Sequence, residues 1–89
     1  MFLRVYPNPF RTATTVLLEL RQPLDLSVRV FDPRGRLLRT LGSGPARAGP
    51  EWLAWDGRDA SGTPVAAGIY YLRIEAPSIV LGRRLVLVR

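Results

Sequence analysis

Short runs of alternating apolar and polar residues, separated by turns rich in Gly and Pro, predict an all-β protein. Seven such runs follow one another at spacings typical of a sandwich domain. Nowhere does an apolar period of 3.6 residues last long enough to indicate a helix. These observations predict a seven-stranded antiparallel β-sandwich of immunoglobulin-like type. The 89 residues suffice for one core, so residues 1–89 are predicted to form a single domain.

The predicted strands are bounded by residues that interrupt a sheet. Pro7 and Pro9 end the first strand because proline has no amide hydrogen to donate to a ladder. Asp32-Pro33-Arg34-Gly35 has the composition of a type I turn. Residues 42–50 are rich in Gly and Pro and are expected to form a crossing loop, and Gly82 is expected to mark a bulge or a bend. The expected strands are residues 2–6, 14–20, 26–31, 36–41, 51–55, 69–75 and 79–88.

The segment from Trp55 to Ile74 is the one around which the chain is organised. A strand ends on Trp55, a turn follows, and Tyr70, Leu72 and Ile74 then share one face of a second strand. We interpret this segment as a β-hairpin with a long loop and Trp55 as the central anchor of the core. The other expected core residues are Phe10, Val16, Leu18, Leu20, Leu26, Val28, Val30 and Leu53.

The loop of this segment is expected to be ordered, because its residues have local structural roles. The carboxylates of Asp56 and Asp59 can accept hydrogen bonds from amides one or two residues further on. Gly57 and Gly62 tolerate positive φ, and Gly68 allows a bend where the next strand begins.

Composition excludes several classes of chemistry. The chain has no Cys and no His, and all 13 basic residues are Arg. A Ser-His-Asp type of triad is therefore absent, and no disulfide can form. The acidic pair Asp56 and Asp59 resembles a calcium loop only weakly, because Arg58 stands where an EF-hand has an oxygen ligand. We expect no enzyme activity, no metal and no cofactor.

The net charge of +6 does not by itself indicate nucleic-acid binding. Arg29, Arg39 and Arg73 alternate with apolar residues along different strands, whereas phosphate-binding residues normally cluster. The first residues also lack the pattern of a signal peptide, because Arg4 interrupts a short apolar run. We therefore expect no nucleic-acid partner, no membrane span, and an export signal, if the domain is exported, further upstream.

Two features are unusual for a plain sheet. Trp52 lies on the face opposite Leu53 and Trp55, where it either stacks on a sugar or partner protein or is covered by a cross-strand neighbour or an Arg side chain. Residues 85–88 are apolar on both faces, as expected of a strand covered twice or one that a partner recognises as an extended peptide.

Four segments together resemble a known family across nearly the whole chain. They read YPNPFRTATTVLLEL, VRVFDPRGRLLRTL, WDGRDASGTPVAAGIYYLRI and RRLVLVR. They are similar to the C-terminal sorting domain of the type IX secretion system, which ends longer secreted enzymes or adhesins of Bacteroidetes-like bacteria. They also resemble the related immunoglobulin-like domain of the flagellar hook-capping protein, whose signature contains a W-D-G-x-D-x-x-G loop.

The resemblance assigns motif roles to individual residues. Sorting domains commonly have Lys where Arg84 stands, a difference that matters to a receptor that distinguishes the two side chains. The family motif residues are Pro7, Asn8, Pro9, Asp32, Gly35, Arg36, Trp55, Asp56, Gly57, Asp59, Gly62, Gly68 and Tyr70. The basic and apolar terminal signal would be Arg83, Arg84, Leu85, Val86, Leu87, Val88 and Arg89.

The resemblance implies a non-catalytic module that directs a parent protein through the periplasm and outer membrane and attaches it to the cell surface. Its partners would be secretion machinery proteins of the outer membrane and an upstream cargo domain of the same chain, with the module itself a monomer. An end at Arg89, directly after the apolar run, favours this sorting branch. The alternatives are a structural assembly or adhesion module of the hook-cap type, or a carbohydrate-binding module that uses Trp52.

Overall fold

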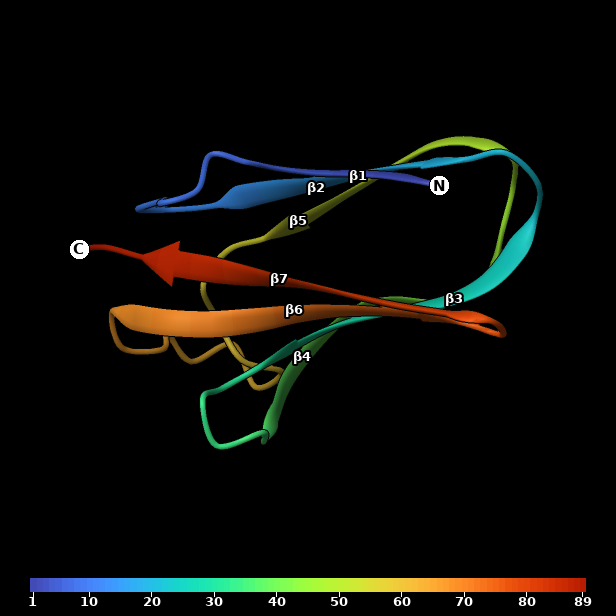
Figure 1. Cartoon of the computed structure of the whole chain (residues 1–89). Helices are drawn as coiled ribbons and strands as arrows, with labels where there is room; N and C mark the ends of the chain where they lie inside the picture. Colours follow the sequence, from blue (N-terminus) through green and yellow to red (C-terminus); the bar gives the residue numbers. More distant parts are fainter.

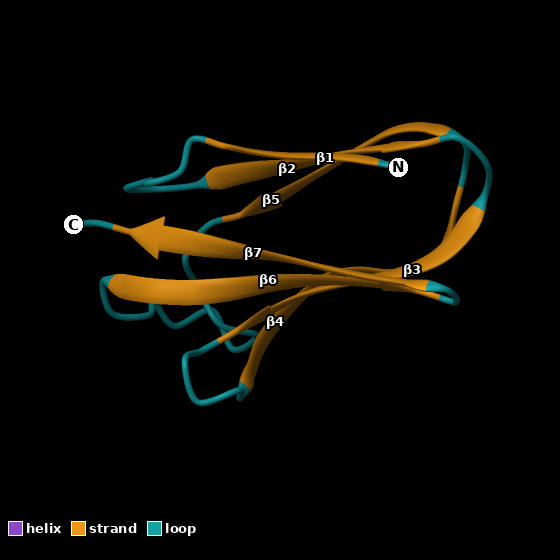
Figure 2. Cartoon of the chain, in the orientation of Figure 1, coloured by secondary structure: helices purple, strands orange, loops and turns teal.

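The computed structural model describes residues 1–89 and contains seven strands in two antiparallel sheets that face each other (Figures 1 and 2). One sheet has the strand order β1-β2-β5 and the other the order β4-β3-β6-β7. The predicted all-β immunoglobulin-like sandwich is confirmed. No helix is long and apolar enough to cross a bilayer. The strands are β1 (Phe2–Tyr6), β2 (Thr14–Leu20), β3 (Leu24–Phe31), β4 (Leu37–Ala46), β5 (Gly49–Trp55), β6 (Gly68–Ala76) and β7 (Ile79–Leu87).

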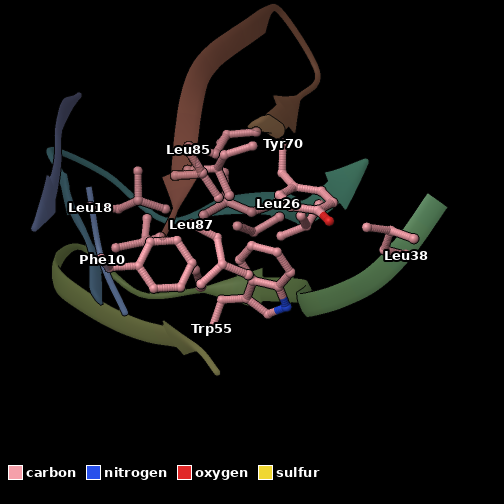
Figure 3. Packing of buried hydrophobic residues seen from close by; sticks show 14 of the residues in the cluster. Phe10, Leu18, Leu26, Leu38, Trp55, Tyr70, Leu85 and Leu87 are labelled. Carbon is pink, nitrogen blue, oxygen red and sulfur yellow. The ribbon is translucent and has the colours of Figure 1, made fainter. Parts of the chain in front are cut away.

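The core lies between the two sheets and is formed by alternate residues of the strands. Trp55 is fully buried, and its ring packs against those of Phe10 and Tyr70, with centroids 5.6 and 5.4 Å away (Figure 3). The predicted inward faces of the strands are confirmed, although Leu53 is only half-buried. The buried apolar residues are Phe10, Val16, Leu18, Leu20, Leu26, Val28, Val30, Leu38, Ala46, Trp55, Tyr70, Leu72, Ile74, Leu85 and Leu87.

The segment from Trp55 to Ile74 is not a β-hairpin, contrary to the sequence-based prediction. β5 pairs with β2, while β6 pairs with β3 and β7, so residues 56–67 carry the chain from one sheet to the other. Alternation shows only which face of a strand is apolar. Because both sheets turn their apolar faces to the same core, the pattern is equally compatible with either pairing partner.

Residues 42–50 are also not a crossing loop. β4 continues to Ala46 and pairs with β3 along its whole length, and β5 already begins at Gly49. Pro45 is tolerated because β4 is an edge strand, where a missing amide hydrogen interrupts no ladder. Gly44 adopts a φ of 116°, which glycine reaches readily, and it stays paired with Leu26 of β3.

Gly82 does not mark a bulge. The β6–β7 ladder stays in register from the pair Gly68–Leu87 to the pair Ala76–Ile79. The register shifts of this sheet instead lie in the β3–β4 ladder. The last strand ends at Leu87, one residue earlier than predicted.

Candidate functional site

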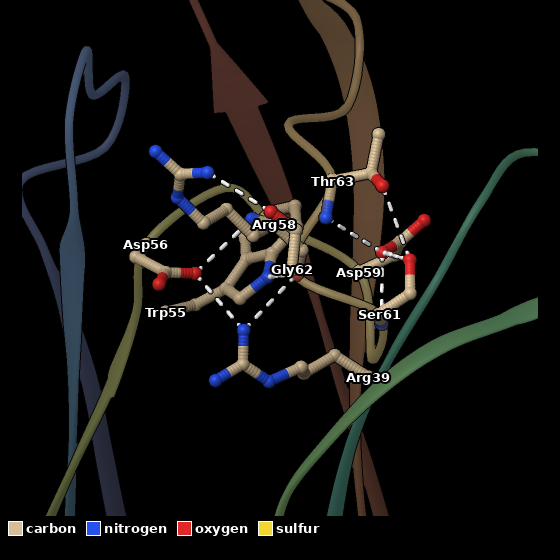
Figure 4. Close-up of polar contacts among 8 residues, drawn as sticks. All are labelled: Arg39, Trp55, Asp56, Arg58, Asp59, Ser61, Gly62 and Thr63. Atoms are coloured by element: carbon tan, nitrogen blue, oxygen red, sulfur yellow. Dashed lines mark hydrogen bonds and ion pairs between the residues drawn. The ribbon is translucent and has the colours of Figure 1, made fainter.

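The loop after Trp55 is held by hydrogen bonds that begin at the indole ring. The Trp55 Nε1–H donates to the carbonyl oxygen of Arg58 at 2.9 Å (Figure 4). The Asp56 Oδ1 accepts from the Arg58 amide at 3.1 Å and from Arg39 Nη1 at 3.0 Å. Arg39 comes from β4, so this ion pair ties the loop to the four-stranded sheet. Gly57 has a φ of 72° and lies against Leu87, where a larger residue would meet both strain and a neighbour.

Asp59 organises the second half of the loop. Its Oδ1 accepts from the Ser61 hydroxyl at 2.7 Å, from the Ser61 amide at 3.0 Å and from the Thr63 amide at 3.0 Å. The Ser61 side-chain hydrogen bond, followed by the Thr63 amide, lowers the pKa of Asp59 below its ordinary value of 3.8. Gly62 has a φ of 86°. The predicted local role of both aspartates is confirmed, and the expectation that this loop binds no calcium stays a prediction.

The Gly68-Ile69-Tyr70 motif fastens the end of the loop to the core. Gly68 has a φ of 153° at the start of β6, where the chain turns into the strand. The Tyr70 ring lies in the core, and its hydroxyl donates to the carbonyl oxygen of Ala66. Burial raises the pKa of Tyr70 above its ordinary value of 10.0, because the phenolate would be poorly solvated there.

The entry motif Pro7-Asn8-Pro9 contacts the opposite end of the chain. The Asn8 Nδ2 donates to the Arg84 carbonyl oxygen at 2.7 Å, and the Asn8 Oδ1 accepts from the Val86 amide at 2.9 Å. The Asn8 side-chain amide thus forms the same two hydrogen bonds with β7 that a peptide group of a neighbouring strand would form. Both X-Pro bonds of the motif are cis, and the buried Thr14 hydroxyl donates to the Pro7 carbonyl oxygen at 2.6 Å.

Phe10 continues this contact in the manner of a short parallel strand. Its amide donates to the Val86 carbonyl oxygen at 2.9 Å, and its carbonyl oxygen accepts from the Val88 amide at 2.9 Å. The outer edge of β7 is therefore occupied from Arg84 to Val88. A partner cannot add a strand along this part of the edge as the sequence suggested, because its outward backbone groups from Arg84 to Val88 are already bonded. An Asn between two prolines, followed by an aromatic residue, is the sequence signal for this cover.

The terminal residues divide into a buried and an exposed set. Leu85 and Leu87 are completely buried and belong to the core, while Val86 and Val88 are half-buried. This arrangement explains most of the apolar character of the tail by packing. Its exposed members are Arg83, Arg84 and Arg89, and Arg89 Nη2 donates to the carbonyl oxygen of Val65 at 2.8 Å.

The turn between β3 and β4 is built around one carboxylate. The Asp32 Oδ1 accepts from the amides of Arg34 and Arg36, each at 2.9 Å, and Arg36 Nε lies 3.5 Å from Oδ2. The Arg36 amide hydrogen bond is the main cause that lowers the pKa of Asp32 below 3.8. Gly35 takes a φ of 87° and donates its amide hydrogen to the Asp32 carbonyl oxygen, as in a type I turn with a following bulge.

The structure brings this turn and the basic tail together around one open hollow. The hollow has a volume of about 550 Å³ and lies on the outer face of the four-stranded sheet, beside Asp32, Gly35, Arg83 and Arg84. Phe31, Tyr71 and Arg84 are direct cross-strand neighbours there, on three adjacent strands. Gly82 lacks a side chain in the next row and leaves the space open. We call this surface the turn-tail hollow.

Trp52 lies on the outer face of the other sheet, as predicted. Its side chain is 64% exposed, so it makes no contribution to the core. The sequence did not indicate that Phe2 and Tyr6 of β1 are exposed on the same sheet. No group of three or more His, Cys, Asp or Glu side chains is placed to hold a metal ion.

Comparison with known proteins finds one matching family and two relatives with a similar sequence. The family described as FlgD Ig-like domain has a sequence model that matches residues 9–78. The basal-body rod modification proteins FlgD of Salmonella typhimurium and Salmonella typhi are each 42% identical to this chain, over 73% of it and 29% of each relative. The chain therefore spans less than a third of these proteins.

Two solved structures from Porphyromonas gingivalis share the fold. PorZ, described as an essential bacterial surface component of the type-IX secretion system, aligns with a TM-score of 0.70 and 28% identity over 98% of this chain and 11% of PorZ. Dimeric latent PorU aligns with a TM-score of 0.73 and 21% identity, over 97% of this chain and 9% of PorU. The PorU likeness concerns the fold alone.

Proposed function

The chain belongs to the FlgD Ig-like domain family, and on that premise we propose that it is a non-catalytic module that sorts a parent protein across the outer membrane and holds it at the cell surface. Its partners are an outer-membrane component of a type IX secretion machinery and a cargo domain of the same chain. The likeness to PorZ supports this branch, because it covers 98% of the chain, whereas the family match ends at residue 78, before β7.

The observation that carries the proposal is the turn-tail hollow. The turn of Asp32 to Gly35 and the arginines Arg83 and Arg84 are about fifty residues apart in sequence, yet they line the same hollow. A receptor that docks there contacts both motifs at once. The exposed guanidinium groups favour an acidic receptor surface, because charge complementarity directs such encounters.

The test is export of a reporter fused to this chain, with a periplasmic targeting signal placed upstream, in a host that has type IX machinery. The intact chain brings the reporter to the cell surface. The double variant Arg83→Ala/Arg84→Ala leaves the reporter in the periplasm, because it removes the two exposed arginines beside the hollow. The matched control is Arg21→Ala/Arg47→Ala, which removes two exposed arginines from outside the hollow.

Protease accessibility of the reporter on whole cells gives the readout, and the folded state of each purified variant is checked by circular dichroism. Equal surface display of the Arg83/Arg84 variant and the intact chain contradicts the assignment of these residues. Equal loss in the Arg21/Arg47 control shows that export responds only to total charge.

A second candidate is an assembly module of a larger surface or flagellar structure, favoured by the 42% identity to the FlgD proteins. In that case the same sandwich holds the parent protein in a complex and carries no export information. The reporter fused to the intact chain then stays in the periplasm of the type IX host. This outcome separates the two candidates without any substitution.

A further inference from the structure

The outer face of the three-stranded sheet is an exposed aromatic surface. Side chains alternate along each strand, so Phe2, Arg4 and Tyr6 of β1 point away from the core. Phe2 is 52% exposed and Tyr6 67%, and Trp52 of β5 is 64% exposed. Burial cannot explain these rings, because each gains little from the core and each leaves a large apolar area in water.

The strand register places these side chains in rows across the sheet. Arg4 pairs with Leu17 of β2, and Leu17 pairs with Trp52 of β5, so the three lie side by side. Tyr6 and Thr15 form the next row. Since β1 and β5 are two strand spacings apart, roughly 10 Å, the rings of Trp52 and Tyr6 stand at opposite edges of the sheet.

A hollow of about 340 Å³ lies between these rings, lined by Arg4, Tyr6, Thr15, Leu17 and Trp52. We call this surface the aromatic platform. Its volume is at the small end of ligand sites, which run from about 300 Å³ upwards. Its lining combines two aromatic rings and the aliphatic Leu17 with the Thr15 hydroxyl and the Arg4 guanidinium group. A surface with both apolar rings and hydrogen-bonding groups matches a sugar, which has an apolar C–H face and hydroxyl groups at its rim.

Arg4 determines which kind of sugar fits. Its guanidinium carbon lies 5.8 Å from the Tyr6 ring centroid, so the aromatic face holds the charged group in place. The three ion pairs of the structure involve Arg36, Arg39 and Arg73, and Arg4 has no carboxylate partner. Glu19 is the acidic residue on this face. It pairs with Phe2, so it lies in the row next to that of Arg4, and Tyr6 lies in the row on the other side of Arg4. The platform thus presents a cation without a carboxylate partner, which lies beside Tyr6 on β1 and across Leu17 from Trp52.

From this arrangement we propose that the aromatic platform binds an acidic polysaccharide of the uronic-acid type. Sugar rings stack on Trp52 and Tyr6, and Arg4 pairs with a uronate carboxylate through its planar fork of N–H donors. β1 and β5 are the edge strands of this sheet, so no further strand of the sheet flanks the platform on either side. The site is on the sheet opposite the turn-tail hollow, and the proposal is independent of the sorting function.

The experiment titrates the chain with polygalacturonate and follows tryptophan fluorescence. Trp55 is fully buried, so a saturable change reports Trp52. Trp52→Ala weakens binding, measured by affinity electrophoresis, by roughly tenfold or more, the effect of losing one stacked ring. Arg4→Ala weakens binding by roughly tenfold, while Arg4→Lys recovers only part of it because the planar fork is lost.

Three controls test whether binding is specific to the aromatic platform and to an acidic sugar. Tyr71→Ala removes a half-exposed ring of the other sheet and leaves binding unchanged. Arg21→Ala/Arg47→Ala lowers the net charge by more than Arg4→Ala does, yet it weakens binding of polygalacturonate by less than threefold. If this variant loses as much affinity as Arg4→Ala, binding is unspecific ionic adsorption and the proposed site is wrong. Neutral dextran binds roughly tenfold more weakly, and equal binding overturns the role of Arg4. Absence of saturable binding, with Trp52-dependent self-association instead, makes the face an interface between copies and rejects the glycan.

Discussion

Replacing Trp55 by Ala tests whether this residue anchors the core. The side chain is fully buried, and the rings of Phe10 and Tyr70 lose their shared partner when it is removed. Deleting a buried large aromatic costs about 3 to 5 kcal/mol. The whole chain of 89 residues is expected to have an unfolding free energy of roughly 4 to 13 kcal/mol. The variant should therefore lose a large part of the stability of the parent chain, and it reaches the limit of folding if the parent lies at the low end of this range.

Trp55→Phe separates packing from hydrogen bonding. It keeps a ring between Phe10 and Tyr70 but loses the indole donor, and it should cost about 1 to 3 kcal/mol. The Arg58 carbonyl oxygen is not left unpaired in this variant, because Arg39 Nη1 also lies 3.3 Å from it. The loss therefore remains well below that of Trp55→Ala.

Urea titration followed by far-ultraviolet circular dichroism measures these losses without relying on the substituted fluorophore. Trp52→Ala is the matched control and should lie within about 0.5 kcal/mol of the parent chain, because this tryptophan is largely exposed. Losses for Trp55→Ala and Trp52→Ala that agree within about 1 kcal/mol would refute the role of Trp55 as the anchor.

Two further predictions concern pH and the chain end. The pKa of Asp59 is lowered in the folded chain, so its stabilisation is present above the ordinary value of 3.8 and is lost as pH falls through the folded pKa. Urea midpoints below about pH 4 should fall less steeply in Asp59→Asn than in the parent chain, and parallel curves would contradict this assignment. Removing Val88 and Arg89 deletes the hydrogen bonds to Phe10 and Val65, so the trimmed chain should lose about 1 to 3 kcal/mol in the same titration. Arg89→Ala alone should lose less, and a trimmed chain as stable as the parent would show that the Val88–Phe10 and Arg89–Val65 hydrogen bonds contribute nothing to stability.

Residues whose role depends on near neighbours in the sequence were predicted correctly. The inward faces of the strands follow from a backbone period of two, so Val16, Val28 and Ile74 could be assigned to the core from alternation alone. Asp56 and Asp59 each accept a hydrogen bond from the amide two residues further on, which is a property of the turn itself. The seven-strand sandwich follows from the same local signals taken together.

The candidate sites could be predicted only in part. The sequence singled out Trp52 and the arginines of the tail, but not their surroundings. Tyr6 and Arg4 join Trp52 only because β2 lies between β1 and β5. In the same way, the turn at Asp32 and Arg84 line one hollow only because β3 and β7 are both neighbours of β6 in the sheet.

The sequence by itself thus determined the strands, the turns and the apolar faces, whereas the tertiary structure decided which strands became neighbours. β5 joined β2 rather than β6, and the motif around Asn8 covered an edge of β7 more than seventy residues away. The physical reason is that alternation and turn chemistry act over a few residues. Strand pairing instead depends on how the whole chain closes its loops while it buries one common core.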